Sequence, residues 1–388
     1  MNKLLLYDDE KAAVTRYIKK LRNIDYVNQE CDIVTIKREK FKDEIKILEK
    51  RRLETRKKIS WSEESVFDDI DIMIIDYDLI NPEETDLYLT GELVAYLARC
   101  FSKCGLIIGL NQFQLDFDLS MKGHPESYCD LNINSNVLDN NGLWSDERDE
   151  FRPWHWVKIP LYLESMHEKI KEITENIETP LLNLLGLEKI IKFFPRSVTS
   201  FLQQKPEKMT FKEFVLNSGN GLRWRKDDET TNDMMARISA ARLSKWIERL
   251  ILPGHDIIVD APHIVWRFPS LLNGEFENVD SWNKTTLSKK YDELGIDSKK
   301  IKDFRYENSK WVSRPVWFWN EISNFSKIEE VKNPWSRREP PFVFCEDTSC
   351  FFEMTNCKEF LIDSDSSYLK RYVKLIPKYD YQPKVRMM

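Results

Sequence analysis

The sequence predicts an α/β protein, with a doubly wound parallel sheet in its first half and a mixed α/β or α+β domain in its second half. Short apolar runs alternate with longer amphipathic segments, which is typical of a parallel sheet joined by right-handed crossovers. The run at 70–79, IDIMIIDYDL, has the β-branched composition of a strand buried on both faces. It ends in two aspartates, at the place where open α/β sheets bind their ligands.

The elements of the first half follow from this alternation. The expected elements are strands at 3–7, 31–36, 70–75, 105–110 and 154–159, and helices at 10–23, 37–58, 91–104 and 161–177. The polar stretch at 113–153 is rich in Asn and Asp, and we expect a long functional or mobile insertion there. The predicted first domain therefore covers 1–176, with this insertion, and the second covers 177–388.

The composition is that of a folded protein with two or three domains. The chain has 388 residues, and 41% of them are hydrophobic, which is enough to build cores. Its 59 basic and 65 acidic residues nearly balance, which argues against a general nucleic-acid coat. Seven cysteines without a signal-peptide pattern, and the lack of any apolar run of about 18 residues, predict reduced thiols, no membrane contact and a cytoplasmic protein.

Acidic side chains follow two of the expected strands. Asp8 and Asp9 come directly after the first strand, and Asp76 and Asp78 end the third. The carboxyl ends of parallel strands meet at one edge of a sheet, so these acids could surround a hard cation such as Mg²⁺. Asp8 or Asp9 could also cap the helix that follows, which is a purely structural use.

Five motifs of the first half, taken in order, resemble the receiver domain of two-component response regulators. They are LLLYDDE at 4–10, IMIIDYDL at 72–79, TGELVAYLARC at 90–100, LIIGLNQ at 106–112 and VKIP at 157–160. The resemblance covers less than half of the chain and implies a flavodoxin-like sheet. It implies further that Asp8 and Asp9 hold Mg²⁺ and that Asp76 is phosphorylated. The carbonyl of Asp78 would complete the metal shell, and Lys158 would pair with the phosphoryl group.

Two departures from the receiver pattern bear on function. Asn111 stands where receivers carry a Thr or Ser that follows the phosphoryl group, and Ile159 separates Lys158 from the proline. The resemblance thus leaves two readings open: a phosphorylated regulator served by a histidine kinase, or a pseudo-receiver that docks other subunits of a complex. A Mg²⁺-dependent phosphohydrolase, with Asp76 as nucleophile and Asp78 as acid/base, is an alternative that leaves Asp8 and Asp9 unexplained.

The second half resembles no family that we can name. We expect helices at 179–194 and 232–252 and a strand at 255–260. Asp256, Asp260 and His263 could bind a metal or act as acid and base, although a solvated strand with a turn histidine is the simpler reading. The stretch RWRK at 223–226 mixes cations with an aromatic ring, as nucleic-acid contacts do, but three acids follow it.

The remaining signals of the second half are weak. Cys345, Cys350 and Cys357 lack the spacing of a zinc site and fit two strands joined by a turn. Trp317 and Trp319 are expected in a core or at a partner contact. There is no Gly-rich phosphate loop and no nucleophile motif. We therefore expect a regulatory or assembly protein rather than an enzyme, with other proteins as partners and a DNA-binding response regulator as the alternative.

Overall fold

The computed structural model describes residues 1–57, 61–79, 89–111, 127–145, 151–154, 156–202, 206–217, 231–286, 294–325, 328, 341–360 and 370–379. Its first half contains a five-stranded sheet, formed by β1 Asn2–Tyr7, β2 Cys31–Thr35, β3 Ile72–Asp76, β4 Leu106–Asn111 and β5 Leu131–Asn134. The strand order is β2-β1-β3-β4-β5 and every neighbouring pair is parallel. This is the flavodoxin-like order, so the predicted fold class is confirmed.

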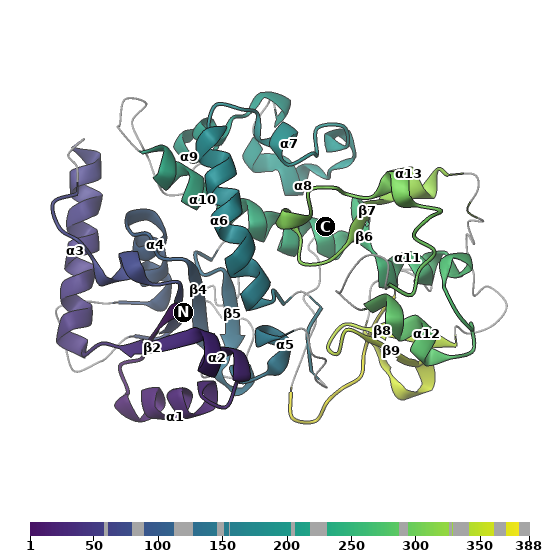
Figure 1. Cartoon of the computed structure of the whole chain (residues 1–388), viewed down its shortest axis with the longest axis horizontal. Helices are drawn as coiled ribbons and strands as arrows, with labels where there is room; N and C mark the ends of the chain where they lie inside the picture. Colours follow the sequence, from purple (N-terminus) through teal and green to yellow (C-terminus); the bar gives the residue numbers. More distant parts are fainter. Residues whose placement is uncertain are drawn as a thin grey trace.

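Helices cover both faces of this sheet, as a doubly wound fold requires (Figure 1). They are α1 Lys11–Leu21, α2 Asp25–Glu30, α3 Arg38–Arg56, α4 Gly91–Phe101, α5 Asn141–Trp144 and α6 Ile159–Glu175. Alternate strand residues face opposite ways, so Leu5 and Met73 join one core cluster while Leu4 and Ile72 join the other. The first cluster takes in α3 and α4, and the second takes in α1 and α5.

The prediction of the fifth strand was wrong. The strand at the sheet edge is β5, which lies inside the stretch that we expected to be an insertion. In the expected strand at 154–159, Ile159 is instead the first residue of α6, and Pro160 lies in the first turn of that helix. A proline is tolerated there because the first N–H groups of a helix have no partner within it. Trp156 and Val157 are buried against the second core cluster without belonging to a strand.

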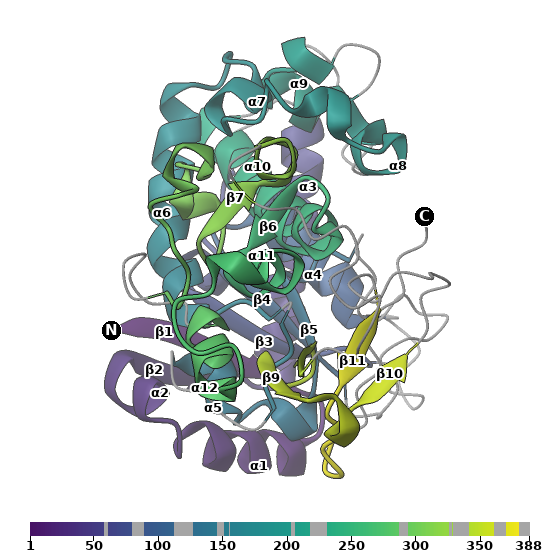
Figure 2. The same ribbon diagram turned by 90° about the vertical axis from the view of Figure 1, so that its right-hand side faces the viewer.

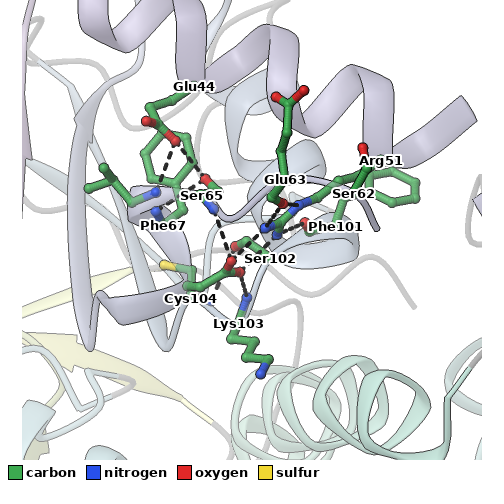
Figure 3. Close-up of polar contacts among 12 residues, drawn as sticks. Glu44, Arg51, Ser62, Glu63, Ser65, Phe67, Phe101, Ser102, Lys103 and Cys104 are labelled. Atoms are coloured by element: carbon green, nitrogen blue, oxygen red, sulfur yellow. Dashed lines mark hydrogen bonds and ion pairs between the residues drawn. The ribbon is translucent and has the colours of Figure 1, made fainter. Parts of the chain in front are cut away.

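Helix α3 is highly charged, and two of its buried charged side chains, Glu44 and Arg51, form hydrogen bonds with the segment before β3 and the end of α4 (Figure 3). The Arg51 guanidinium donates to both carboxylate oxygens of Asp68, at 2.9 and 2.6 Å, and to the carbonyls of Glu63 and Phe101. The Glu44 carboxylate accepts from the Ser65 hydroxyl at 2.8 Å. These charged hydrogen bonds attach α3 to the segment 61–69, which leads into β3, and to the end of α4.

The second half contains a mixed four-stranded sheet. Its strands are β8 Phe342–Cys345, β9 Cys350–Glu353, β10 Lys358–Phe360 and β11 Arg371–Val373, in the order β10-β11-β8-β9. β8 and β11 are parallel, whereas the other pairs are antiparallel. The predicted pair of strands joined by a turn at Asp347 is confirmed. A separate antiparallel pair joins β6 Ile258–Asp260 to β7 Val316–Phe318.

The long helix expected at 179–194 is instead two short pieces. The first is α7 Leu181–Leu184, and a 3₁₀ turn, Ile191–Phe193, forms the second. Gly186 has a φ of +67°, and the N–H of Leu187 donates to the carbonyl of Leu182 at 2.8 Å. A glycine in the left-handed region followed by a hydrogen bond of this kind is the Schellman motif, which ends helices. It ends α7 even though the surrounding sequence has the apolar pattern of a longer helix.

The expected helix at 232–252 is formed by α10 Asn232–Trp246, which continues into a π-helical turn, Ile247–Ile251. The other helices of this half are α8 Arg196–Thr199, α9 Phe211–Asn217, α11 Ala261–Arg267, α12 Val279–Asn283 and α13 Trp319–Ser323. Across the described parts of the chain, no helix combines the length and the apolar character that crossing a bilayer would require.

Helix α10 lies above the parallel sheet as drawn in Figures 1 and 2, close to α6 and α9. It packs along α6, where the Lys169 amine donates to the Ser244 hydroxyl at 2.9 Å. Lys245 donates to the carbonyl of Cys129 at 2.9 Å, and Arg249, in the π-helical turn, donates to that of Asp130 at 2.6 Å. The first core cluster runs from the sheet into the second half without interruption. The domain boundary at residue 176 stays a prediction.

Candidate functional site

The two strands that end in acids lie side by side in the sheet. β1 and β3 are parallel, with Tyr7 level with Ile75, so Asp8 and Asp76 emerge at the same edge. Asp8, Asp9 and Asp76 each offer a carboxylate oxygen, and these oxygens all lie within 4.8 Å of one another. We call these three residues the acid cluster. The structure thus brings together three of the four acids that the sequence singled out.

Burial and mutual repulsion raise the pKa values of the acid cluster. Burial is the main cause for Asp76, and the charges of Asp8, Asp9 and Asp78 add to it, so its pKa rises to about 7. Burial also raises the pKa of Asp8 to about 6, although this side chain accepts a 2.8 Å hydrogen bond from the Glu10 N–H. The pKa of Asp9 is raised too, again mainly by burial. A divalent cation would relieve this repulsion.

The donor set of the acid cluster fits Mg²⁺. Carboxylate oxygens are the ligands that this ion prefers, at about 2.0–2.1 Å, so oxygens within 4.8 Å of one another need only small rotations to share it. The Asp78 side chain is exposed and does not join the group of three. The expectation that the backbone carbonyl of Asp78 completes the metal shell stays a prediction. The N-cap residue of α1 is Glu10, so the expectation that Asp8 or Asp9 caps this helix was wrong; the Asp8 carboxylate instead accepts from the N–H of Glu10 just before the helix.

Two arginines near the acid cluster were missed by sequence reasoning. Arg38, the first residue of α3, opposes the rise that burial causes in the pKa of Asp9. Arg16 of α1 opposes the corresponding rise at Asp8. Arg38 follows β2 by three positions, so the rule that strand ends share one edge could have found it.

The start of α4 approaches the acid cluster very closely. The N–H of Gly91 donates to the Tyr77 carbonyl at 2.8 Å, and the Thr90 hydroxyl accepts from the N–H of Leu93 at 3.2 Å. A Cβ at position 91 would lie 2.5 Å from the carbonyl oxygen of Asp76. Only glycine allows this approach, so the backbone of Asp76 and the first turn of α4 are in direct contact.

Asparagines occupy the ends of the two remaining strands at this edge. Asp76 is level with Leu110, so Asn111 lies one residue further along the neighbouring strand. Asn111 in turn is level with Asn134, the last residue of β5. The edge therefore carries amides where the receiver family has a hydroxyl on the fourth strand and a lysine on the fifth. Asn134 was missed because its strand was expected to be an insertion.

Lys158 does not lie at the end of a strand. It is the N-cap residue of α6, and its side chain is buried with 5% exposure. It lines a cavity together with Asp260 and Arg314 of the second half. It is not among the main groups that shift the pKa of Asp76. The pairing of Lys158 with a phosphoryl group on Asp76, which the resemblance implies, stays a prediction.

A second group of possible metal ligands forms around Asp260. It contains His255 and His263, while Asp256, which the sequence had included, is exposed. The Nδ1 atom of His263 lies 2.5 Å from a carboxylate oxygen of Asp260. The two imidazoles stack at 3.5 Å with an interplanar angle of 17°. Parallel stacked rings cannot both direct a nitrogen lone pair at one ion, so this geometry fits a hydrogen-bonded pair better than a metal site.

The other residues singled out from the sequence fall into place as follows. The RWRK stretch at 223–226 lies outside the described residues. The Sγ atoms of Cys345 and Cys357 are 3.3 Å apart, and Cys350 is level with Cys345 across the β8–β9 pair. Trp317 is fully buried in the core, and Trp319 packs on Phe268.

Comparison with known proteins adds little to this description. No protein-family model matches the chain, and no curated protein matches its sequence. One solved structure that it matches is the RcsB response regulator of Salmonella typhimurium, described in terms of its interaction with DNA. The match has 14% identity and a TM-score of 0.24, and covers 64% of this chain and 91% of that one. A superposition of this quality supports no conclusion, so the flavodoxin-like fold rests on the strand order alone.

Proposed function

We propose that this chain is a receiver-like regulatory protein. Its acid cluster binds Mg²⁺ beside Asp76, and the state of that site governs the contacts that the second half makes with other proteins. The observation that carries the proposal is the meeting of Asp8, Asp9 and Asp76 at one edge of a flavodoxin-like sheet. Paired acids on the first strand and a further acid on the central strand are what a cation-dependent phosphoacceptor site needs.

The chemistry of the site follows from its own residues. When bound, Mg²⁺ would supply positive charge for an incoming phosphoryl group. Asp76 would attack the phosphorus of a phosphohistidine donor as a carboxylate, so that an O–P bond forms while the P–N bond breaks and its electron pair leaves with the donor imidazole. Asp8 and Asp9 would hold the cation, and Arg38 adds a second positive charge nearby. Asn111 has no hydroxyl to follow the phosphoryl group. We therefore propose that the first turn of α4, which contacts the backbone of Asp76 at Gly91, moves when Asp76 is phosphorylated.

A contiguous set of contacts leads from α4 to the second half. Arg99 of α4 forms a buried ion pair with Asp130, the residue that precedes β5. The backbone carbonyl of Asp130 accepts the 2.6 Å hydrogen bond from Arg249. The guanidinium of Arg242 lies 5.1 Å from the ring centre of Tyr128 in the same segment. A displacement of α4 would thus act on α10 and its π-helical turn through residues 128–130.

Calorimetric binding of beryllofluoride in the presence of Mg²⁺ tests this function, because beryllofluoride on an aspartate stands in for its phosphoryl adduct. We expect saturable, Mg²⁺-dependent binding by the wild type and none by Asp76→Asn. Asp69→Asn is the matched control, since Asp69 is exposed and forms an ion pair with Lys3 at the surface.

The outcomes separate the forms of the proposal. Beryllofluoride binding would make a histidine kinase the expected upstream partner. Binding of Mg²⁺ without beryllofluoride would assign a pseudo-receiver that docks subunits of a complex. A wild type that binds neither would overturn the proposal.

A further inference from the structure

Two cysteines of the second half lie side by side although they are 12 positions apart in the sequence. Cys345 is the last residue of β8, and Cys357 follows the 3₁₀ turn Met354–Asn356 just before β10. Their Sγ atoms are 3.3 Å apart, and the Cys345 thiol donates to the sulfur of Cys357. A disulfide has an S–S distance of about 2.05 Å, so the two sulfurs have to approach by roughly 1.3 Å to form one.

The two thiols differ in their access to solvent. Cys345 is fully buried in the core, whereas Cys357 is partly exposed. Two further hydrogen bonds place Cys357: its thiol donates to the carbonyl of Glu353 at 3.3 Å, and its backbone N–H donates to the carbonyl of Met354 at 3.1 Å. A small oxidant can therefore reach Cys357 first, with the sulfur of Cys345 directly behind it.

The surroundings of Cys357 favour its thiolate form. The hydrogen bond from Cys345 lowers the pKa of Cys357, and the positive charge of Lys374 lowers it further, whereas burial opposes both. The Lys374 amine donates to the carbonyl of Asn356, the residue before Cys357, at 3.2 Å. The same sulfur–sulfur hydrogen bond, together with burial, raises the pKa of Cys345. One thiolate thus lies beside one protonated thiol, which is the arrangement that a two-step oxidation uses.

A zinc site is a poorer account of these cysteines. Cys350 is level with Cys345 across the β8–β9 pair, so a third thiol lies on the neighbouring strand. Over the described parts of the chain, however, the groups with the spacing of metal ligands are the acid cluster and the set around Asp260. The three thiols therefore do not gather around one point, and structural zinc takes four ligands. The close pair Cys345 and Cys357 indicates chemistry between two sulfurs instead.

We propose that Cys345 and Cys357 form a reversible disulfide when the chain meets a peroxide. The Cys357 thiolate attacks one peroxide oxygen, so that an S–O bond forms and the O–O bond breaks; the other oxygen leaves as hydroxide and takes up the proton that the Cys357 thiol released. The sulfur of Cys345 then attacks the sulfenic sulfur of Cys357. The S–S bond forms, the S–O bond breaks, and the departing hydroxide takes the Cys345 proton to become water. The two thiols lose two electrons, which reduce one hydrogen peroxide to two waters.

The proposed disulfide lies beside the hydrogen bonds that join β8 to the segment before α6. Glu346 follows Cys345 directly, and its carbonyl accepts from the N–H of Trp154 at 2.9 Å. The carbonyl of Asp347 accepts from the N–H of Arg152, also at 2.9 Å. A covalent bond at Cys345 restrains the end of β8, so oxidation should slow amide hydrogen exchange at Arg152 and Trp154. Unchanged exchange at these two residues in the oxidised protein would overturn this effect on the first half.

Treatment of the reduced full chain with a stoichiometric amount of hydrogen peroxide tests the inference. The readouts are thiol titration of the unfolded protein and mass spectrometry of peptides prepared without a reductant. We expect the loss of two thiols per chain, a link between the peptides that contain Cys345 and Cys357, and recovery of both thiols with dithiothreitol. Cys357→Ser should keep its remaining thiols. Cys350→Ser is the matched control and should form the same link as the wild type, although Cys350 is level with Cys345 on the neighbouring strand.

In Cys345→Ser, the sulfenic acid of Cys357 has no thiol directly behind it, so dimedone should label it about tenfold more than in the wild type. If this buried variant fails to fold, Cys357→Ser, at the partly exposed position, still decides the question. Asp76→Asn should form the disulfide as the wild type does, which separates this inference from the proposed function. The inference is overturned if the wild type keeps its thiols, if the link joins Cys345 to Cys350 or joins two chains, or if Cys357→Ser loses as many thiols as the wild type.

Discussion

Asp76 binds a proton more tightly in the folded protein than in the unfolded chain. Its folded pKa is about 7 and that of Asp8 is about 6, both mainly because of burial, against an ordinary value of 3.8. The folded state therefore binds more protons between about pH 4 and pH 7, and the free energy of unfolding falls as the pH rises through this window. Without Mg²⁺ we expect a loss of about 2–4 kcal/mol between pH 5 and pH 8.

Urea unfolding at pH 5 and pH 8 measures this loss. Asp76→Asn should reduce the pH dependence, because the amide does not titrate. Added Mg²⁺ should raise stability more at pH 8 than at pH 5, since the cation competes with protons for the same oxygens. Equal stability of the wild type at both pH values would contradict the burial of charge at this site.

Cys357 is expected to be the most reactive thiol among the described residues. A hydrogen bond from Cys345 and the charge of Lys374 lower its pKa, and it is partly exposed. Burial raises the pKa values of Cys31, Cys100, Cys104 and Cys129. Brief alkylation at pH 7.5, read by mass spectrometry of peptides, should label Cys357 first, about tenfold faster than these four. Faster labelling of any of the four would contradict the expectation.

At the scale of elements, the junction between β3 and α4 decides whether the acid cluster is correctly built. In Gly91→Ala, the new methyl group would meet the Asp76 carbonyl oxygen at 2.5 Å and the Tyr77 Cα at 2.8 Å, and both are backbone atoms. We expect a loss of about 1–3 kcal/mol in unfolding free energy together with weaker Mg²⁺ binding. Ala98→Gly in the middle of α4 is the control, since it lowers stability through helix propensity, by about 1 kcal/mol, and through the loss of a buried methyl group, without adding an atom near Asp76.

Calorimetric titration of both α4 variants with Mg²⁺ separates stability from site geometry. Gly91→Ala should lose affinity for Mg²⁺, and Ala98→Gly should keep it. If both variants bind alike, the contact at Gly91 is a matter of packing alone.

The elements also show which parts of the fold the sequence could predict. Buried strands such as 70–75 carry an apolar signal that both periodicity and composition reveal, and the parallel topology then places Asp8 and Asp76 at one edge. β5, LNIN, is only four residues long, with alternating asparagines, and reads like a polar loop. The segment around Trp156 is apolar because it is buried in the second core cluster, although it has no regular secondary structure. The spacing of its apolar residues does not distinguish such a segment from a strand.

The acid cluster could be predicted from the sequence, whereas the surroundings of Asp260 could not. The acids follow strands that the sequence reveals, so their meeting needed only the topology. The partners of Asp260 could not be foreseen, because Trp154 and Arg314 reach it from sequence separations of 106 and 54 residues. His255 adopts a φ of +51°, and this turn, rather than any spacing, brings its ring onto His263.

At the scale of the molecule, one face of the parallel sheet is completed by the second half. Met166 and Ile173 of α6 belong to the same core cluster as Ile238 and Leu243 of α10. Re-exposing a large apolar side chain costs about 1.5–3 kcal/mol, and a typical domain is stable by only about 5–15 kcal/mol. Removal of the second half therefore threatens the stability of the sheet domain itself.

We expect the fragment 1–176 to keep the far-UV circular dichroism spectrum of a folded α/β domain. It should, however, unfold at a lower urea concentration than the full chain. It should bind a hydrophobic dye such as ANS, because the face of α6 that α10 covers becomes exposed. Adding the fragment 177–388 in trans should suppress dye binding and restore the urea midpoint. A fragment 1–176 that unfolds as cooperatively as the full chain, at the same urea concentration and without dye binding, would instead establish the independent domain predicted from the sequence. Signals from the acid cluster would then have to cross a separable interface rather than a shared core.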